Sequence, residues 1–297
     1  MKQSEIQDYI KAGEIAREAG KFALEIIKPN VLLLDIADLI EKKIQELGGQ
    51  PAFPVNLSIN EISAHYTPSS DDKTIAFGLL KVDLGVSVNG FIADTAFSID
   101  LTDNKEYKKM IEINQQALNS ALKILKPGAE IREIGDAIQD AIKDSGFSAI
   151  KNLSGHSLDK NQIHGGITLS NYTNNNTNTL KNIAVAIEPF LTSGDGYIYE
   201  GRMSEIFMLQ NFKKPRDSDA RKILAFVQEN YSTRPFCKRW LRKAGFNKID
   251  FLLKILTNQG ILHNFPILIE KGKKPVSQAE HTALILEDKV IITTKDN

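Results

Sequence analysis

Apolar positions repeat at helical spacing in two stretches of the chain that match each other. Residues 23–48 read ALEIIKPNVLLLDIADLIEKKIQELG, and residues 121–146 read ALKILKPGAEIREIGDAIQDAIKDSG, with no gap needed to align them. Each copy predicts a helix that ends at Lys-Pro, a short connection, and a second amphipathic helix that ends at glycine. Similar composition can produce two such hairpins, but an ungapped match that includes the Lys-Pro break favours duplication. The chain is therefore predicted to contain two similar α+β halves with a cleft between them.

Alternating apolar and polar positions predict strands between and after these helices. Residues 81–101, KVDLGVSVNGFIADTAFSIDL, alternate around Asn89-Gly90, which is the strongest short-range signal for a β-hairpin. The segment 171–182 is rich in Asn and Thr, and we interpret it as a polar loop with little capacity to pack. Further strands are expected at 183–190, 197–200, 204–209 and 280–294.

Residues 213–243 differ in character from the rest of the chain. Lys and Arg outnumber acids in this stretch, and the apolar spacing is helical after the capping sequence DSDA. We expect a small helical subdomain inserted between strands. Basic helices also occur in proteins that bind nucleic acid or the ribosome surface, but no groove-reading motif is present and a solvated helical face is the simpler interpretation.

Composition excludes several classes of protein. The 297 residues include 37 basic and 37 acidic side chains, so general binding to DNA or to an anionic membrane surface is not expected. Charged residues at 25% and hydrophobic residues at 42% are typical of globular proteins, and no apolar run approaches the ~18 residues of a membrane span. The single cysteine, Cys237, excludes a disulfide framework and a cysteine-based zinc site. We expect a cytoplasmic globular protein.

Two aspartates in the predicted hairpin are candidates for metal binding. A two-residue turn places Asp83 opposite Ala96 and Asp94 opposite Gly85, so both carboxylates share one face as diagonal neighbours. The small residues beside them leave room above the sheet. Two such carboxylates repel each other unless something neutralises them, and a divalent metal would do so. The alternative is a solvent-facing sheet surface, with the opposite face as the only core.

Further polar residues in apolar strand contexts strengthen the metal interpretation. His156 follows a glycine in LSGHS, Glu188 interrupts the apolar run IAVAIEPF, and Glu280 precedes the apolar run in AEHTALIL. Buried acids are costly unless they are paired or bound to metal. Carboxylates with one imidazole suit Mn²⁺, Fe²⁺, Co²⁺ or Zn²⁺, and this set is large enough for two ions that share a water. The predicted reaction class is metal-assisted hydrolysis.

These residues lie in stretches that, as a set, resemble the methionine aminopeptidases, and specifically the type 2 branch in its compact archaeal form. The resemblance covers essentially the whole chain and implies the pita-bread (creatinase/aminopeptidase) fold, an α+β fold with pseudo-twofold halves. It implies a catalytic domain at 1–209 and 264–297 and a helical type 2 insertion at 210–263. The matching stretches are AFPVNLSINEISAHYTP (52–68), KVDLGVSVNGFIADTA (81–96), LSGHSL (153–158), QIHGG (162–166), AIEPFLTSGDG (186–196) and FPILIEKGKKPVSQAEHTALIL (265–286).

The resemblance also implies a dinuclear metal centre. Two divalent ions, drawn from Co, Mn, Fe or Zn, would be held by Asp83, Asp94, His156, Glu188 and Glu280. Asp94 and Glu280 would bridge the ions, and Glu188 would also be the general base for the bridging water.

The substrate side of the site is implied in the same way. His65 would contact the substrate near its scissile amide, and His164 would hydrogen-bond the scissile carbonyl and stabilise the developing oxyanion. The pocket for the methionine side chain would be lined by Phe53, Ile163, Phe190 and Phe265. His281, beside a ligand, is expected to have a supporting or structural role, and His263, which matches no family role, is expected at the surface. The loop 165–171 departs from the family pattern, so preferences for substrate length and inhibitors are not transferred.

The expected function is metal-dependent removal of the initiator methionine from nascent chains whose second residue is small. The partners would be N-terminal methionyl peptides, with a transient ribosome contact, no DNA and no membrane, and the chain would act as a monomer. Two alternatives stay open: an Xaa-Pro aminopeptidase or prolidase, and a non-catalytic pita-bread protein that binds RNA or the ribosome. The complete set of ligands argues for catalysis.

Overall fold

The duplicated helical stretches form two pairs of helices in the computed structural model, which describes residues 1–296. The first pair is α1 (Gln3–Ile26) and α2 (Leu33–Glu46), and the second is α3 (Lys108–Ile124) and α4 (Ile131–Ile142). In each pair the first helix ends just before the Lys-Pro sequence, because proline has no N–H to donate and its ring clashes with the preceding turn. The predicted helical hairpins are confirmed.

The central hairpin has the predicted register. Strands β4 (Leu79–Val88) and β5 (Phe91–Asp100) pair so that Asp83 faces Ala96 and Gly85 faces Asp94. Asn89 and Gly90 both have positive φ, at 51° and 91°, as a type I′ turn requires. The hairpin therefore places both aspartates on one face of the sheet.

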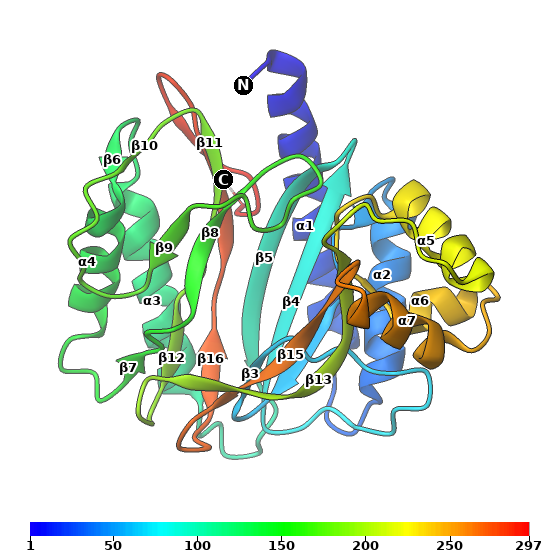
Figure 1. Cartoon of the computed structure of the whole chain (residues 1–297). Helices are drawn as coiled ribbons and strands as arrows, with labels where there is room; N and C mark the ends of the chain where they lie inside the picture. The colour runs from blue at the N-terminus through cyan, green and yellow to red at the C-terminus, as the bar shows by residue number, and fades with distance from the viewer. Residues whose placement is uncertain (297) are drawn as a thin grey trace.

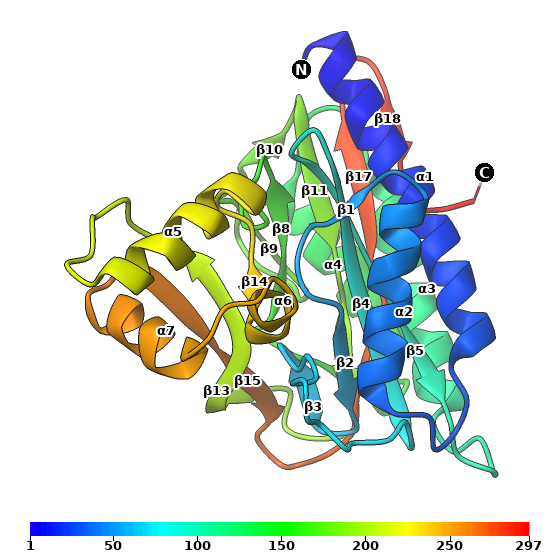
Figure 2. The same ribbon diagram turned by 90° about the vertical axis from the view of Figure 1, so that its right-hand side faces the viewer.

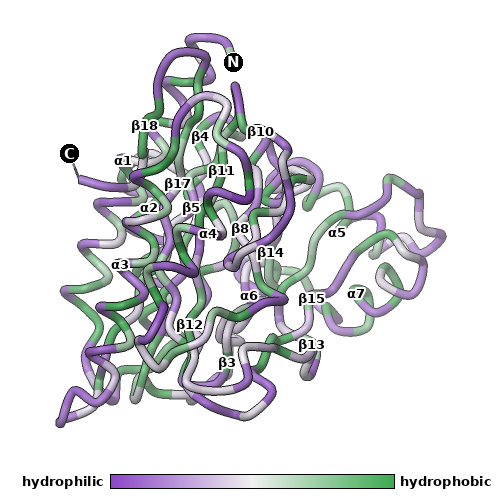
Figure 3. The backbone as a smooth tube through the Cα atoms, turned by 90° about the vertical axis from the view of Figure 1, so that its left-hand side faces the viewer, coloured by the Kyte–Doolittle hydropathy of each residue, from purple (hydrophilic) through white to green (hydrophobic). Residues whose placement is uncertain are grey.

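Helices cover one face of the strands in both halves of the molecule. In the first half, α1 and α2 pack against a sheet in the order β1 (Gln50–Pro51), β4, β2 (Asn56–Ile59), with β5 on β4. In the second half, α3 and α4 pack against a five-stranded sheet. Figure 2 shows α1, α2 and α3 on one side of the strands, and Figure 3 shows these helices alternating between polar and apolar segments. The opposite face of the strands is left for the candidate site.

The five-stranded sheet brings together segments from the whole second half. Its order is β18 (Val290–Ile292), β17 (His281–Ile285), β11 (Ile183–Ile187), β8 (Ser154–Leu158) and β9 (Thr168–Ser170). A three-stranded sheet follows the order β16 (Val276–Gln278), β12 (Phe190–Thr192), β7 (Ser148–Ala149). A two-stranded sheet pairs β10 (Thr179–Leu180) with β6 (Ala129–Glu130).

The two halves are joined by contacts between β5 and the start of β17. An isolated bridge pairs Ala96 with Glu280, and the Thr95 hydroxyl donates to the Glu280 carbonyl at 2.9 Å. The Thr282 hydroxyl accepts from the Asp94 N–H at 2.7 Å and lies 2.8 Å from the Asp94 carbonyl. These bonds fix the strand of Asp94 against the strand of Glu280. Figure 1 shows β5 and the red C-terminal strands running beside each other at the centre of the molecule.

All four of the expected strands after residue 182 differ in extent from the prediction. The run 183–190 is broken into β11 and β12 because Pro189 cannot donate to a sheet ladder. The runs 197–200 and 204–209 form one strand, β13 (Ile198–Leu209), whose register shifts against β15 (Leu262–Glu270). The run 280–294 is divided by a polar turn into β17 and β18.

The Asn-rich segment 171–182 is mostly exposed, as expected for a polar loop, but hydrogen bonds order it. The side chains of Asn174 and Asn176 each accept the backbone N–H two residues further on, which orders the segment. The carbonyls of Asn176 and Asn178 then accept the first N–H groups of α4. The segment therefore caps α4 from outside the helix.

The basic stretch lies between β13 and β15 and forms helices of its own. These are α5 (Ser218–Asn230), α6 (Lys238–Lys243) and α7 (Ile249–Asn258), with the short strand β14 (Phe236–Cys237) paired to β13. Asp217 caps α5 by accepting two backbone N–H groups, as the sequence DSDA predicts. The helices pack around a separate apolar cluster that includes Ile223, Val227, Leu241, Leu253 and Leu256. Figure 1 shows them at one side of the sheet, next to α2.

A buried arginine links this helical segment to α2. The Arg239 guanidinium, 1% exposed, donates to both carboxylate oxygens of Glu41 at 2.6 and 2.9 Å and to Asp38 at 2.6 Å. The Trp240 indole N–H also donates to Glu41, at 2.8 Å. Arg239 Nε donates to the Pro68 carbonyl, three residues after His65. The network therefore ties α6, α2 and the segment after His65 together.

Replacing Arg239 with methionine should destabilise the fold strongly. The Arg239→Met change leaves the buried Glu41 carboxylate without its charge partner, which costs about 3–5 kcal/mol. The control is Arg242→Met, because Arg242 pairs with Asp250 where the two side chains are 37% and 65% exposed, and such pairs contribute about 1 kcal/mol or less. The measurement is the free energy of unfolding in urea. Equal losses in the two variants would contradict the assigned role of the network.

Candidate metal centre

The residues predicted for the site line one cavity on the face of the strands opposite the helices. The cavity has a volume of about 350 Å³. It is lined by Phe53, His65, Asp83, Asp94, His156, Ile163, His164, Glu188, Phe190, Phe265 and Glu280. The structure thus brings together every candidate ligand, catalytic residue and substrate-binding residue.

Strand register explains why the acids and His156 meet. Ala96 of β5 pairs with Asp83 of β4 on one side and with Glu280, just before β17, on the other. The three neighbouring strands therefore place Asp83, Asp94 and Glu280 close together. On β11, Ala186 pairs with His156 of β8, and Glu188 follows two residues later, which points its side chain to the same face. All five side chains therefore face one cavity, from two sheets that meet at the bridge between Ala96 and Glu280.

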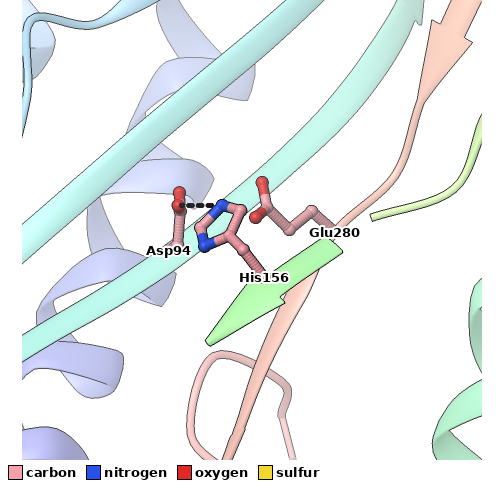
Figure 4. A group of neighbouring side chains, drawn as sticks. All are labelled: Asp94, His156 and Glu280. Carbon is pink, nitrogen blue, oxygen red and sulfur yellow. Dashed lines mark ion pairs between the residues drawn. The ribbon is translucent and has the colours of Figure 1, made fainter. Parts of the chain in front are cut away.

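Three of these side chains are close enough to share one ion. One ligand atom from each of Asp94, His156 and Glu280 lies within 4.8 Å of those of the other two (Figure 4). His156 Nε2 lies 3.9 Å from Asp94 Oδ2 and 3.3 Å from Glu188 Oε1. Asp83 lies beside them and accepts a hydrogen bond from Gln278 Nε2 at 3.3 Å.

Burial strongly disfavours the charged forms of these groups. Burial raises the pKa of Asp83 to about 7. It also raises the pKa values of Asp94, Glu188 and Glu280 well above their usual range, and repulsion from neighbouring carboxylates adds to the rise for these three. Burial lowers the pKa of His156 to about 3, helped by the nearby His164. His156 is therefore neutral near pH 7 and can act as a ligand through a ring nitrogen.

The chain does not neutralise these acids with a cation of its own. Within residues 1–296, no Lys or Arg forms an ion pair with any of the four carboxylates. The buried Lys81 donates instead to the carbonyls of Asn60 and Val276. Asp83 Oδ1, Asp94 Oδ1 and Glu280 Oε1 are buried and lack a hydrogen-bond partner. Unsatisfied carboxylate oxygens beside a neutral imidazole fit a divalent metal.

The part of the cavity around Phe53, His65 and Phe265 is aromatic and contains neutral imidazoles. His65 has a φ of 63°, its Nδ1 lies 3.1 Å from the Pro266 carbonyl, and burial lowers its pKa to about 4. The His164 ring meets the His156 ring edge-on at 4.7 Å. Phe53 lies over Gly85, where an added Cβ would be 2.3 Å from the Phe53 ring. Gly85 therefore makes room for an aromatic wall of the cavity.

The expectation that His263 lies at the surface is wrong. His263 is half-buried, and its ring lies 4.6 Å from that of Phe265 in an edge-on arrangement. Since His65 also meets Phe265 edge-on, at 5.2 Å, the two histidines flank the same aromatic ring. His281 has a structural contact, as expected, with its Nδ1 3.0 Å from the Thr294 hydroxyl.

Some residues of the site were missed by the sequence analysis. Gln278, which donates to Asp83, lies two residues before Glu280 in SQAEHT, and that spacing within a strand was the available signal. Ile206 and Pro235 add apolar lining from β13 and from the connection that follows α5. Nothing local in the sequence indicates that Pro235 returns to the cavity.

Comparison with known families gives the class of this protein. The sequence profile of metallopeptidase family M24 matches residues 7–218, so the chain belongs to that family. Family membership implies divalent metal ions, in agreement with the cluster of acids. No helix in residues 1–296 has the length and apolar character needed to cross a membrane.

Curated relatives place the chain within family M24. It is 41% identical to a methionine aminopeptidase of Archaeoglobus fulgidus, over 96% of this chain and 97% of that protein. It is 40% identical to a methionine aminopeptidase of Methanocaldococcus jannaschii, over 98% of this chain and all of that protein. Within the family, the chain therefore belongs to the methionine aminopeptidases, as the sequence motifs indicate.

Solved structures confirm the pita-bread fold. A thermophilic Arx1 superposes with a TM-score of 0.83 at 15% identity, covering 99% of this chain and 91% of that one. A methionine aminopeptidase from Thermotoga maritima superposes with a TM-score of 0.71 at 20% identity, covering 100% and 98%. A prolidase from Pyrococcus furiosus gives 0.64 at 20% identity, and only 65% of its longer chain is covered. These likenesses establish the α+β fold with its two related halves.

Replacing Asp83 with asparagine should stabilise the metal-free protein in a pH-dependent way. The pKa of Asp83 is about 7 in the folded chain and ~3.9 in an unfolded chain, so the folded state retains a proton between these values. The contribution of Asp83 to the stability of the folded state is highest below about pH 4, where Asp83 is protonated, and this contribution is lost as pH rises through about 7. The Tm advantage of Asp83→Asn should therefore grow over this range and then level off.

Calorimetry of chelator-treated protein from pH 4 to 9 would measure this effect. Both proteins contain the same histidines, so the effect of histidine titration cancels in the Tm difference between variant and wild type. The control is the exposed Asp103→Asn, for which no Tm difference is expected. A constant Asp83→Asn effect across the range would contradict the assignment of Asp83 as a buried, uncompensated acid.

Proposed function

We propose that this chain removes the N-terminal methionine from nascent chains with a small second residue, using two divalent metal ions. The observation that supports this most directly is the buried group of four carboxylates and one neutral imidazole without a counter-cation, in a chain of the methionine aminopeptidase family. In this proposal the ions are held by Asp83, Asp94, His156, Glu188 and Glu280. When bound, they supply the Lewis acidity that activates water and polarises the scissile carbonyl.

Glu188 is assigned the role of general base. Its carboxyl is buried, its pKa is raised by burial and by Asp94 and Asp83, and Oε1 lies 3.3 Å from His156. A carboxylate with a raised pKa accepts a proton from the attacking water and can return it to the leaving amine. The position of Glu188 at the break between β11 and β12 gives its side chain access to the cavity.

The two histidines of the substrate side have different assigned tasks. If His65 donates through Nδ1 to the Pro266 carbonyl, its Nε2 is an acceptor facing the substrate amide. His164, whose pKa is lowered mainly by burial, is neutral and can donate to the oxyanion that develops on the scissile carbonyl. Neither imidazole adds positive charge to a site that must accept metal ions.

The aromatic end of the cavity fits a methionine side chain. Thioethers make favourable contacts with aromatic rings and are flexible enough to fill an irregular apolar pocket. In our proposal this pocket is lined by Phe53, Ile163, Phe190 and Phe265. We also propose that the chain acts as a monomer on nascent chains in the cytoplasm, with at most transient contact with the ribosome.

The two alternatives are less well supported. A prolidase or Xaa-Pro aminopeptidase would share the ligands, but the matching curated relatives at 35–41% identity are methionine aminopeptidases. A binding protein that has lost catalysis would not need five intact ligand positions in one cavity. The basic helices do not change this conclusion, because several of their charges form ion pairs, such as Lys238 with Glu205 and Arg242 with Asp250.

An assay of metal-stripped protein tests the proposal. Mn²⁺, Fe²⁺, Co²⁺ and Zn²⁺ are added in turn to protein with a Met-Ala-Ser, a Met-Leu-Ser or a Gly-Pro peptide. We expect metal-restored release of methionine from Met-Ala-Ser alone, measured by chromatography of the free amino acid. Cleavage of Gly-Pro alone would indicate a prolidase, and a folded protein inactive with every metal would favour the binding protein.

Substituting a proposed bridging ligand tests the metal assignment separately. Asp94→Ala and Glu280→Ala should each abolish turnover, because in our proposal both carboxylates would hold the metal ions that activate water. Their folds should remain intact, since each change removes a buried acid that costs free energy in the metal-free protein. Activity and circular dichroism are measured together. Turnover retained by either variant would refute the ligand set.

A further inference from the structure

The peptide segment at Glu188 and Pro189 lies outside the regular pairing of the sheet. The ladder between β11 and β17 ends at Ile187 and His281, and β12 begins only at Phe190. The Glu188 carbonyl is therefore not held by a ladder bond of these sheets, and the Pro189 carbonyl accepts only a long backbone bond, from the Ala279 N–H at 3.3 Å. Since buried carbonyls need partners, other groups must complete their hydrogen bonding.

Two buried asparagine side chains provide those partners. Asn171 Nδ2 donates to the Glu188 carbonyl at 3.0 Å, and Asn114 Nδ2 donates to the Pro189 carbonyl at 3.0 Å. Each asparagine is only 1% exposed. We call Asn114 and Asn171 the asparagine pair. Side-chain amides thus hold two consecutive carbonyls at the point where the strand breaks.

The second bond of each amide reaches another part of the site. Asn171 Nδ2 also donates to the Leu153 carbonyl, at 3.2 Å, directly before strand β8 with His156. Asn114 Nδ2 lies 3.2 Å from the Ser277 hydroxyl, on strand β16 and three residues before Glu280. Asn171 therefore bridges the segments of His156 and Glu188, and Asn114 bridges those of Glu188 and Glu280.

We propose that the asparagine pair are positioning residues for the metal centre, with Asn171 setting the spacing between the His156 and Glu188 side chains. His156 Nε2 and Glu188 Oε1 are 3.3 Å apart, so a small relative shift of their two segments changes the geometry offered to an ion. One amide that donates to both segments resists such a shift. The inference rests on the proposed function, which makes these two side chains ligands.

This role differs from a general contribution to stability. Groups that orient metal ligands through hydrogen bonds affect metal affinity and turnover, whereas a structural hydrogen bond elsewhere affects unfolding alone. Asn171 lies directly after β9, at the end of the segment 165–171 that was expected to be a loop and contains this strand. The geometry therefore assigns to the end of this segment the task of positioning the proposed metal ligands.

The test replaces Asn171 with residues of similar size. Asn171→Leu removes the donor, and Asn171→Asp places an oxygen against the two carbonyl oxygens, so it should have the larger effect. Metal-free protein is titrated with Mn²⁺ by calorimetry, and kcat and KM are measured with Met-Ala-Ser. We expect the Kd for Mn²⁺ to rise on the order of 10-fold or more and kcat to fall similarly, with KM changed by less than about twofold.

The control is Asn211→Leu. The Asn211 side-chain amide donates to the Gly260 carbonyl at 2.6 Å, next to the helical segment and outside the cavity. Its loss should lower Tm without changing Mn²⁺ affinity or kcat. If Asn171→Leu does not fold, Asn171→Ser takes its place. Its hydroxyl can donate a hydrogen bond, but the side chain is too short to bridge both carbonyls, so the same loss of Mn²⁺ affinity is expected.

The outcomes separate this inference from the proposed function. Wild-type affinity and kcat in the Asn171 variants, with only a Tm loss like that of Asn211→Leu, would overturn the positioning role and leave the proposed function intact. A wild-type protein that neither binds Mn²⁺ nor releases methionine would overturn both. Weakened Mn²⁺ binding with a fall in kcat at unchanged KM is the result that supports the asparagine pair.

Discussion

The structure depends on one costly arrangement: four carboxylates from two adjoining sheets are buried around one cavity, with neutral imidazoles beside them. Burial and mutual repulsion raise the pKa values of these acids, and no Lys or Arg in residues 1–296 compensates them. A fold tolerates such a group when protons or metal ions neutralise it. Much of the surrounding structure can be understood as the means of holding these side chains in place.

The duplicated architecture provides this support from both sides. Each half covers one face of its strands with a helical pair, which leaves the other face free for the cavity. The halves meet where Ala96 pairs with Glu280 and Thr282 bonds to Asp94, so the strands that carry two of the buried acids are fixed to each other across the junction. Ile206 of β13 and Pro235 of the segment between β13 and β15 close the cavity further, and Arg239 fastens that segment to α2.

Local patterns predicted much of this fold because their causes are local. The Lys-Pro breaks ended two helices, and Asn89-Gly90 determined the register that places Asp83 and Asp94 on one face. Predictions failed where a residue depends on distant partners. Pro189 divided an apolar run that looks like one strand. His263 is half-buried because Phe265 packs against it.

The amino-acid sequence by itself determined the family, the helical pairs, the central hairpin and the identity of the candidate ligands. It could do so because motifs, turn residues and apolar periodicity are properties of residues that are neighbours in the sequence. Only the tertiary structure decided how those ligands meet. The distance of 3.3 Å between His156 and Glu188, the bond from Gln278 to Asp83 and the amide bridges of Asn114 and Asn171 join residues far apart in the chain. The register of separate strands and the packing of buried polar groups set such contacts, and neither can be deduced from local sequence.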